Sequence, residues 1–158
     1  MGLKIERSEF TDQEYIDARR KLIENIDALS MLLQQPGFGR GDYSVGAELE
    51  MSIVDDRAQA LPLNRKVLEQ SLDPNLQLEL DRFNLEYNLS PVMSAGTPFG
   101  KMQAELENAL AELGDIAATY GGRIIPIGIL PTLCEEQLQS AAMTDLERYR
   151  ALQAGIQR

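Results

Sequence analysis

The sequence contains no histidine, and its 158 residues include a single cysteine. Without histidine, neither a Ser-His-Asp triad nor a Cys-His pair can be assembled, and the usual nitrogen ligand of zinc is missing. A metal ion bound by this chain would therefore be held by oxygen ligands. Cys134 has no partner for an internal disulfide and no histidine to activate it, so we interpret it as an ordinary thiol.

Basic residues are also few, with 15 lysines and arginines against 25 aspartates and glutamates and a formal net charge of −10. This balance argues against nucleic acid and anionic membranes as partners, because both repel an acidic surface. No apolar run approaches the roughly 18 residues of a membrane span, and residues 1–6 lack the apolar run of a secretory signal. We therefore expect a cytoplasmic protein that forms one domain over residues 1–158.

Two segments show the strict alternation of apolar and polar residues that predicts a strand with one buried face. The first, residues 43–54, carries Glu48 and Glu50 on its polar face, roughly 7 Å apart. The second, residues 83–90, carries Glu86 on its polar face. If both strands lie in one sheet, their carboxylates line one surface that suits a hard divalent cation. The alternative is that these glutamates are simply solvated.

Helical spacing of apolar residues predicts a long amphipathic helix over residues 12–35, which a capping box of Thr11 and Glu14 precedes. The other predicted elements are a short helix at 65–71, a second amphipathic helix at 102–120, a strand at 123–129 and a final helix after a capping box of Thr144 and Glu147. Helices on one face of a largely antiparallel, curved sheet give an α+β fold that leaves the glutamate-bearing face open.

One irregularity lies in residues 76–89, where the apolar positions change phase after Arg82. We interpret this change as a β-bulge within one strand. A bulge would place Glu79 and Asp81 on the face that carries Glu86. We do not count these two residues as ligands.

Four short motifs follow one another along the chain. Residues 46–50 read Gly-Ala-Glu-Leu-Glu, residues 86–91 read Glu-Tyr-Asn-Leu-Ser-Pro, residues 127–133 read Ile-Gly-Ile-Leu-Pro-Thr-Leu, and residues 143–150 read Met-Thr-Asp-Leu-Glu-Arg-Tyr-Arg. Together and in this order, they resemble the glutamate–cysteine ligase-like family, carboxylate–amine ligases built on the glutamine synthetase fold. Residues 130–132 depart from other branches of the family, which have Thr-His-Pro there.

The resemblance implies an ATP-dependent ligase whose open sheet is the active-site floor. Strand glutamates bind Mg²⁺ or Mn²⁺ ions, which hold the phosphates of ATP. An amino-acid carboxylate attacks the γ-phosphate to give an acyl phosphate, and a small amine then displaces phosphate to form an amide. The sequence names neither substrate.

Site residues follow from the same resemblance, position by position. The implied catalytic residues and metal ligands are Glu48, Glu50 and Glu86, and the implied substrate contacts are Asn88, Arg148 and Arg150. Surface ion pairs are the alternative interpretation for the two arginines.

Family members continue beyond the point where this sequence stops, so the resemblance implies an N-terminal portion of such a ligase with little activity of its own. A sheet edge exposed by a missing part would favour a homo-oligomer. The alternative function is a non-catalytic binding or assembly module that retains the fold.

Overall fold

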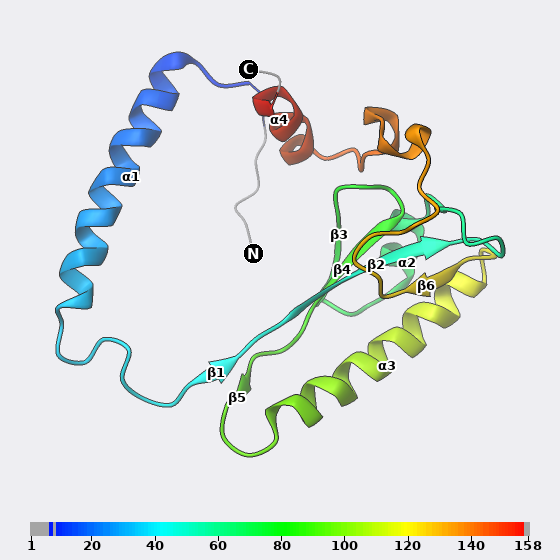
Figure 1. Cartoon of the computed structure of the whole chain (residues 1–158), viewed down its shortest axis with the longest axis horizontal. Coiled ribbons are helices and arrows are strands. Elements are labelled where there is room, and N and C mark those ends of the chain that lie inside the picture. Colours follow the sequence, from blue (N-terminus) through cyan, green and yellow to red (C-terminus); the bar gives the residue numbers. More distant parts are fainter. Residues whose placement is uncertain (1–6, 8, 157–158) are drawn as a thin grey trace. The chain divides into compact units, whose positions relative to one another are not determined.

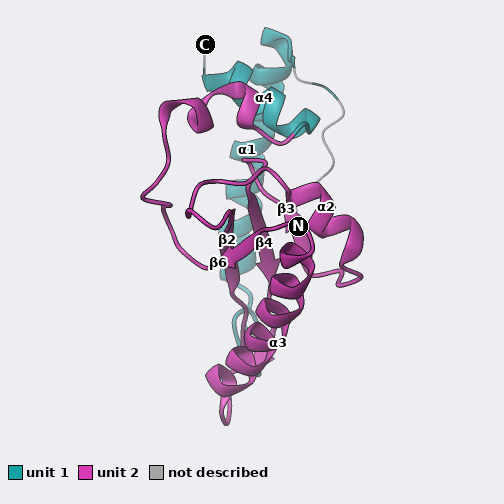
Figure 2. Ribbon diagram, turned by 90° about the vertical axis from the view of Figure 1, so that its right-hand side faces the viewer, with its two compact units in different colours: residues 1–42, 145–158 teal, residues 43–144 magenta. Residues whose placement is uncertain are grey.

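The computed structural model describes residue 7 and residues 9–156. The chain divides into two compact units (Figure 2). One unit is formed by residues 43–144 and contains all the strands of the described residues. The other is formed by residues 1–42 together with residues 145–158.

The 43–144 unit is built on a four-stranded sheet in the order β3–β4–β2–β6, and its neighbouring strands are antiparallel (Figure 1). The strands are β2 (Glu48–Val54), β3 (Leu76–Leu78), β4 (Asn84–Asn88) and β6 (Arg123–Ile125). A separate two-stranded pair joins β1 (Ser44–Val45) to β5 (Val92–Met93). The predicted α+β class and the antiparallel pairing are confirmed.

Two helices pack on the apolar face of the sheet, namely α2 (Asn64–Gln70) and α3 (Pro98–Ala118). Figure 1 shows α3 running along one side of the strands. The shared core draws on alternate residues of the strands and on one face of each helix, and its members include Met51, Ile53, Val67, Leu85, Tyr87, Leu113 and Ala117. Burial of each large side chain stabilises the fold by about 1.5–3 kcal/mol. The period-two pattern therefore commits the other face of β2 and β4 to polar residues.

The predicted strand at 43–54 is interrupted, because residues 46 and 47 separate β1 from β2. The pairing of β1 with β5 is shifted by one residue from that of β2 with β4: Val45 lies opposite Val92, whereas Glu48 lies opposite Asn88. Between these pairs, residues 46–47 on one strand lie opposite residues 89–91 on the other. The second strand therefore has one extra residue, which defines a β-bulge. Pro91 lies in the longer segment, where the ladder lacks its amide donor.

The interpretation of the phase change near Arg82 as a bulge is wrong. β3 and β4 are the two arms of a hairpin, with Leu76 opposite Tyr87 and Leu78 opposite Leu85. The amide of Asn84 donates to the carbonyl of Asp81 at 2.9 Å and closes the turn between them. The apolar residues change phase because the chain reverses direction there.

The α3 helix begins earlier than predicted, at Pro98, and ends at Ala118. Beyond it, Gly121 has a φ of +73° in the left-handed region, as expected for a glycine that closes a helix. The strand that follows stops at Ile125, one residue before Pro126, and is shorter than the predicted 123–129. Two short 3₁₀ helices, Glu135–Leu138 and Ser140–Ala142, follow.

The capping box predicted for Thr144 is also wrong. The Thr144 hydroxyl is buried, donates to the carbonyl of Glu79 at 2.6 Å and accepts from Asn64 Nδ2 at 2.8 Å. It is therefore committed to the sheet unit. The final helix α4 begins three residues later and covers Glu147–Ile156.

The other unit contains α1 (Asp12–Leu33) and α4. The capping box of α1 is confirmed: the Thr11 hydroxyl accepts from the amide of Glu14 at 3.3 Å, and the Glu14 carboxylate accepts from the amide of Thr11 at 2.9 Å. The latter bond is the main cause of a lowered pKa for Glu14. Among the described residues, none of the helices combines the length and apolar character needed to cross a bilayer.

Candidate functional site

The predicted glutamates share one face of the sheet. In the register of β2 and β4, Glu50 lies directly opposite Glu86 and Glu48 lies directly opposite Asn88. Their neighbours in sequence, such as Met51 and Leu85, point into the core on the other face. The alternation of the sequence and the pairing of the strands therefore bring three carboxylates onto one polar surface.

Glu50 and Glu86 occupy the type of position at which opposite side chains lie closest. The amide of Ile53 donates to the carbonyl of Phe83 at 2.7 Å, and that of Leu89 donates to Ala47 at 2.9 Å. Hydrogen-bonded pairs thus fall on the odd-numbered residues of this ladder, and Glu50–Glu86 is a non-hydrogen-bonded pair. At such pairs the Cα atoms lie about 4.5 Å apart. Like charges in this arrangement destabilise a sheet unless a cation lies between them.

Asn88 supports one member of this pair. Its side-chain Nδ2 donates to Glu86 Oε1 at 2.6 Å, two residues away along the same strand face. On the other side of β4, Gln77 of β3 lies opposite Glu86. Glu86 is half-buried between these neighbours, whereas Glu48 and Glu50 are exposed. Asn88 therefore contacts a glutamate of the site, and its predicted contact with substrate stays a prediction.

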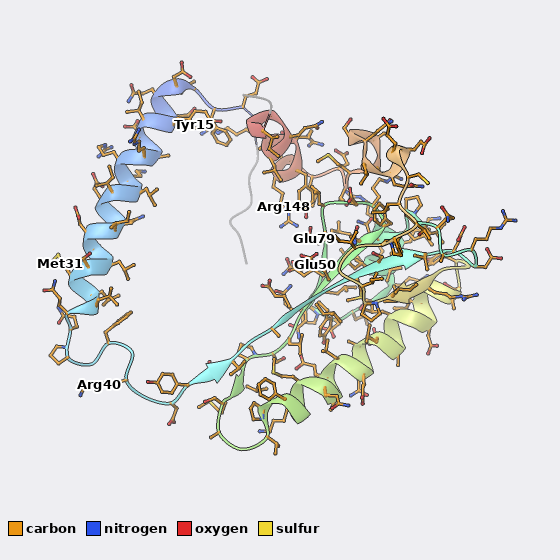
Figure 3. The ribbon with its side chains drawn as sticks, in the orientation of Figure 1. Tyr15, Met31, Arg40, Glu50, Glu79 and Arg148 are labelled. Atoms are coloured by element: carbon orange, nitrogen blue, oxygen red, sulfur yellow. The ribbon has the colours of Figure 1, made fainter. Side chains whose placement is uncertain are left out.

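A hollow of about 370 Å³ opens beside Glu50 on this face. Glu79 and Asp81 form one wall, and residues 128–130 with Leu133, from the third sequence motif, form another. Figure 3 labels Glu50 and Glu79, which lie close together on this side of the sheet. Three carboxylates and no lysine or arginine line the hollow.

Asn64 and Thr144 hold the wall that carries Glu79 and Asp81. Asn64 Nδ2 lies within hydrogen-bonding distance of Thr144 Oγ1, of the Asp81 carbonyl at 3.1 Å and of the Asn84 carbonyl at 3.3 Å. The Thr144 amide donates to the Leu80 carbonyl at 2.7 Å. Both Asn64 and Thr144 are only 2% exposed. A buried pair with its hydrogen bonds satisfied fixes the backbone of this wall.

The carboxyl group of Asp81 is partly desolvated beside the hollow. Burial raises the pKa of Asp81 above its ordinary value, because the ionised carboxylate is poorly hydrated there. The carboxylate of Glu79 accepts from the amide of Leu80 at 2.6 Å.

The predicted trio does not share one hollow, and Glu86 lines neither the hollow beside Glu50 nor the one beside Glu48. Glu50 lines the first with Glu79 and Asp81, whereas Glu48 and Asn88 line a second hollow of about 400 Å³. Across residues 9–156 and residue 7, no three carboxylate or thiol side chains are arranged to hold a metal ion. The strands thus bring two carboxylates face to face, and a bound cation would complete its shell with water or substrate oxygens.

Arg148 and Arg150 belong to α4, in the unit formed by residues 1–42 and 145–158. Arg150 forms ion pairs with Asp145 and Glu147, and its hydrogen bond to Glu147 is the main cause of its raised pKa. The guanidinium of Arg148 lies 4.5 Å from the ring centroid of Tyr149, a cation–π contact. Arg150 thus has the surface ion pairs that were the alternative interpretation.

Glu79 and Asp81 were not among the predicted ligands, and the structure places both beside Glu50. Their alternation with apolar neighbours in residues 76–81 was the available signal.

Comparison of the chain with models of protein families, with curated proteins and with solved structures gives no match.

Proposed function

We propose that the open sheet face binds a divalent cation, Mg²⁺ or Mn²⁺, as part of an ATP-dependent carboxylate–amine ligase that resembles the glutamate–cysteine ligase-like family. The observation that carries the proposal is the register that sets Glu50 directly opposite Glu86, with Glu48 and Asn88 as the next pair. A cation there would turn a repulsive cross-strand pair into two charge-assisted contacts.

The role of each side chain follows from this geometry. Glu50 and Glu86 supply the ligand oxygens that face one another, and water or substrate oxygens complete the shell in place of Glu48, which lines the second hollow. The bond from Asn88 to Glu86 orients that carboxylate. Mg²⁺ keeps several water ligands and is commonly bound through one or two carboxylates plus substrate phosphates, which suits a floor that offers two facing carboxylates. When bound, ATP supplies the phosphoryl group that activates the carboxylate substrate.

The acidic hollow beside Glu50 suits the amine partner of such a reaction. Its lining carries three carboxylates and hydrophobic contacts from residues 129, 130 and 133. A small protonated amine would be attracted there, and the desolvated Asp81 has a raised pKa that favours proton exchange closer to neutrality than an ordinary aspartate. The phosphates of ATP would need cations that neither hollow lining supplies, so we expect the 158-residue chain to form little or no amide alone.

The second candidate is a non-catalytic binding or assembly module. Within the described residues, the lack of a three-ligand group and the local ion pairs of Arg150 favour it. In that case the face glutamates are solvated and can be replaced without loss.

The test is a Mn²⁺ titration monitored by electron paramagnetic resonance. Bound Mn²⁺ loses the sharp six-line signal of the free ion, so the remaining signal measures the free concentration. The wild type is compared with Glu48→Gln, Glu50→Gln and Glu86→Gln, each of which keeps the side-chain length and removes the charge. We expect binding to weaken about tenfold or more for Glu50→Gln and Glu86→Gln, since each removes a charged ligand.

Glu107→Gln is the matched control, because Glu107 is exposed on α3, which packs against the opposite face of the sheet. Equal Mn²⁺ binding by the wild type, the face variants and this control would exclude the metal floor and favour the second candidate. Measurable ATP-dependent amide formation by the wild-type chain would contradict the expected lack of activity.

A further inference from the structure

The α1 helix has a continuous apolar face that is exposed to solvent. None of its 22 residues, all of them described, is buried. Eight large hydrophobic residues of this face are about half exposed: Tyr15, Ile16, Leu22, Ile23, Ile26, Leu29, Leu32 and Leu33. A face of this size on one helix is an interaction surface rather than a scatter of single exposed residues.

The spacing of these residues is that of a coiled-coil seam. Leu22, Ile26, Leu29 and Leu33 follow one another at intervals of four, three and four residues, and Tyr15 continues the row one heptad before Leu22. An alternation of three and four keeps one narrow stripe facing a partner helix. Arg19 occupies the remaining seam position. The helix carries five acidic and three basic residues from Asp12 to Leu33, so an anionic membrane surface is not its partner.

We infer that α1 is a dimerisation helix that pairs antiparallel with α1 of a second copy of this chain. The register that brings Leu22 level with Ile26 of the second copy also brings Tyr15 level with Leu33. Every seam position except Leu29 then faces an apolar residue, and Leu29 faces Arg19. A two-fold axis relates the two copies and repeats each contact, as closed dimers require.

The charges of the helix select the antiparallel arrangement. In a parallel pair in register, Arg19 of one copy would face Arg19 of the other inside the seam. In the antiparallel pair Arg19 lies level with Leu29 of the second copy, and Asp27 of that copy lies on the same flank within reach of its guanidinium. Helix geometry places Arg19, Ile23 and Asp27 on that one flank. The two-fold axis gives two such ion pairs.

The exposed area is sufficient for a stable pair. A CH₂ group corresponds to roughly 30 Å², so eight half-exposed side chains present on the order of 500 Å² per copy. Apolar atoms make up about two thirds of the area of a homodimer interface. The full interface would then bury roughly 800 Å² per copy, which is the size of specific, stable complexes. This surface is independent of the ligase proposal and of the sheet edge that the sequence suggested for self-association.

The test compares Ile26→Asp with Met31→Asp by sedimentation equilibrium of the full chain. Both substitutions replace an exposed apolar residue of α1 by aspartate: Ile26 is 54% exposed and lies in the seam, whereas Met31 is 68% exposed and lies on the opposite face. Figure 3 labels Met31 and Tyr15, near the two ends of the helix. We expect a dimer for the wild type and for Met31→Asp, and at least a hundredfold weaker dimer for Ile26→Asp, because the change is repeated in both copies.

The expected circular dichroism is the same for both variants, which separates lost association from lost folding. A wild type that is monomeric at about 100 μM, where complexes of micromolar affinity would form, would overturn the inference. So would a dimer that Ile26→Asp leaves intact. A monomer that only Ile26→Asp destabilises would show that the face is covered within its own chain, which also overturns it.

Disulfide trapping decides the orientation in a Cys134→Ser background. Mixed Tyr15→Cys and Leu33→Cys chains are expected to form a heterodimeric disulfide, whereas Leu33→Cys alone is not, because the two Leu33 positions lie at opposite ends of an antiparallel pair, about 27 Å apart. Efficient trapping of Leu33→Cys with itself would show a parallel pair and refute the proposed register.

Discussion

The facing carboxylates of β2 and β4 predict that a substitution which weakens metal binding stabilises the fold. Glu50 and Glu86 form a non-hydrogen-bonded cross-strand pair, so each carries a repulsive charge opposite the other. Glu50→Gln removes one charge while keeping the shape of the side chain. We expect the free energy of unfolding to rise in the absence of divalent cations.

The size of the effect follows from the geometry. Directly opposite like charges on a sheet destabilise it by roughly 0.2–1 kcal/mol, and two unit charges about 5 Å apart in high dielectric repel each other by an amount within this range. Glu50→Gln and Glu86→Gln should each stabilise by about 0.5 kcal/mol. The double variant should gain little beyond either one, because the first substitution already removes the repulsion. Glu48→Gln should change less, since its opposite residue is the neutral Asn88.

The assay is urea unfolding at 25 °C monitored by far-ultraviolet circular dichroism, with the wild type and the four variants measured in low salt and in 1 M NaCl. In 1 M NaCl the Debye length is only about 3 Å, so screening should remove the difference in the free energy of unfolding between the wild type and the variants. With Mn²⁺ at 100 times its dissociation constant, the wild type should gain about 2.7 kcal/mol, and the variants should gain less.

Additive effects of Glu50→Gln and Glu86→Gln would show that the two carboxylates do not interact across the strands. A loss of stability in either single variant, unchanged by salt, would show that the glutamates contribute through packing or hydrogen bonds, and the electrostatic reasoning would be refuted.

Asn64→Ala should lower the free energy of unfolding by roughly 2–3 kcal/mol in urea, because it leaves the buried Thr144 hydroxyl and two carbonyls short of a donor; a wild-type midpoint would contradict this. The raised pKa of Asp81 favours folding at low pH, and this contribution is lost as the pH rises through the raised value. Asp81→Asn should therefore stabilise at pH 7 and change little below about pH 4, in urea titrations across pH. Gly121→Ala should cost about 1 kcal/mol in thermal unfolding, because φ is +73° there; an unchanged midpoint would argue against this conformation.

Periodicity was sufficient to predict which residues share a face. Strict alternation through Glu48, Glu50 and Glu86 assigned them to the polar side of two strands, because the side-chain period of a strand is two. Register was not predictable, since it depends on the turn that joins paired strands. The β3–β4 turn contains Arg82 and Phe83 rather than glycine or proline, so the sequence pattern of this hairpin resembles that of a single strand with a bulge.

Local motifs succeeded where no distant partner competed for their side chains. Thr11 and Glu14 form the predicted capping box on an exposed helix. Thr144 and Glu147 have the same spacing, but the Thr144 hydroxyl instead bonds Asn64, a residue 80 positions earlier. The wall of the hollow could not be foreseen for the same reason, because Glu79 and Asp81 are held by contacts from distant parts of the chain.

The bond between Asn64 and Thr144 also bears on the order of folding. The β3–β4 hairpin closes over a short loop, whereas the wall of the hollow requires a contact across 80 residues, which is entropically costly and forms late. During synthesis, the α2 helix and the hairpin leave the ribosome before residue 144 exists. At 5–20 residues per second, roughly 3–12 seconds separate the emergence of Arg82 from that of Thr144. Through that interval the side-chain amide of Asn64 is hydrogen-bonded to water in place of the Thr144 hydroxyl. The part of the nascent sheet beside Asn64 is then open to chaperones and proteases.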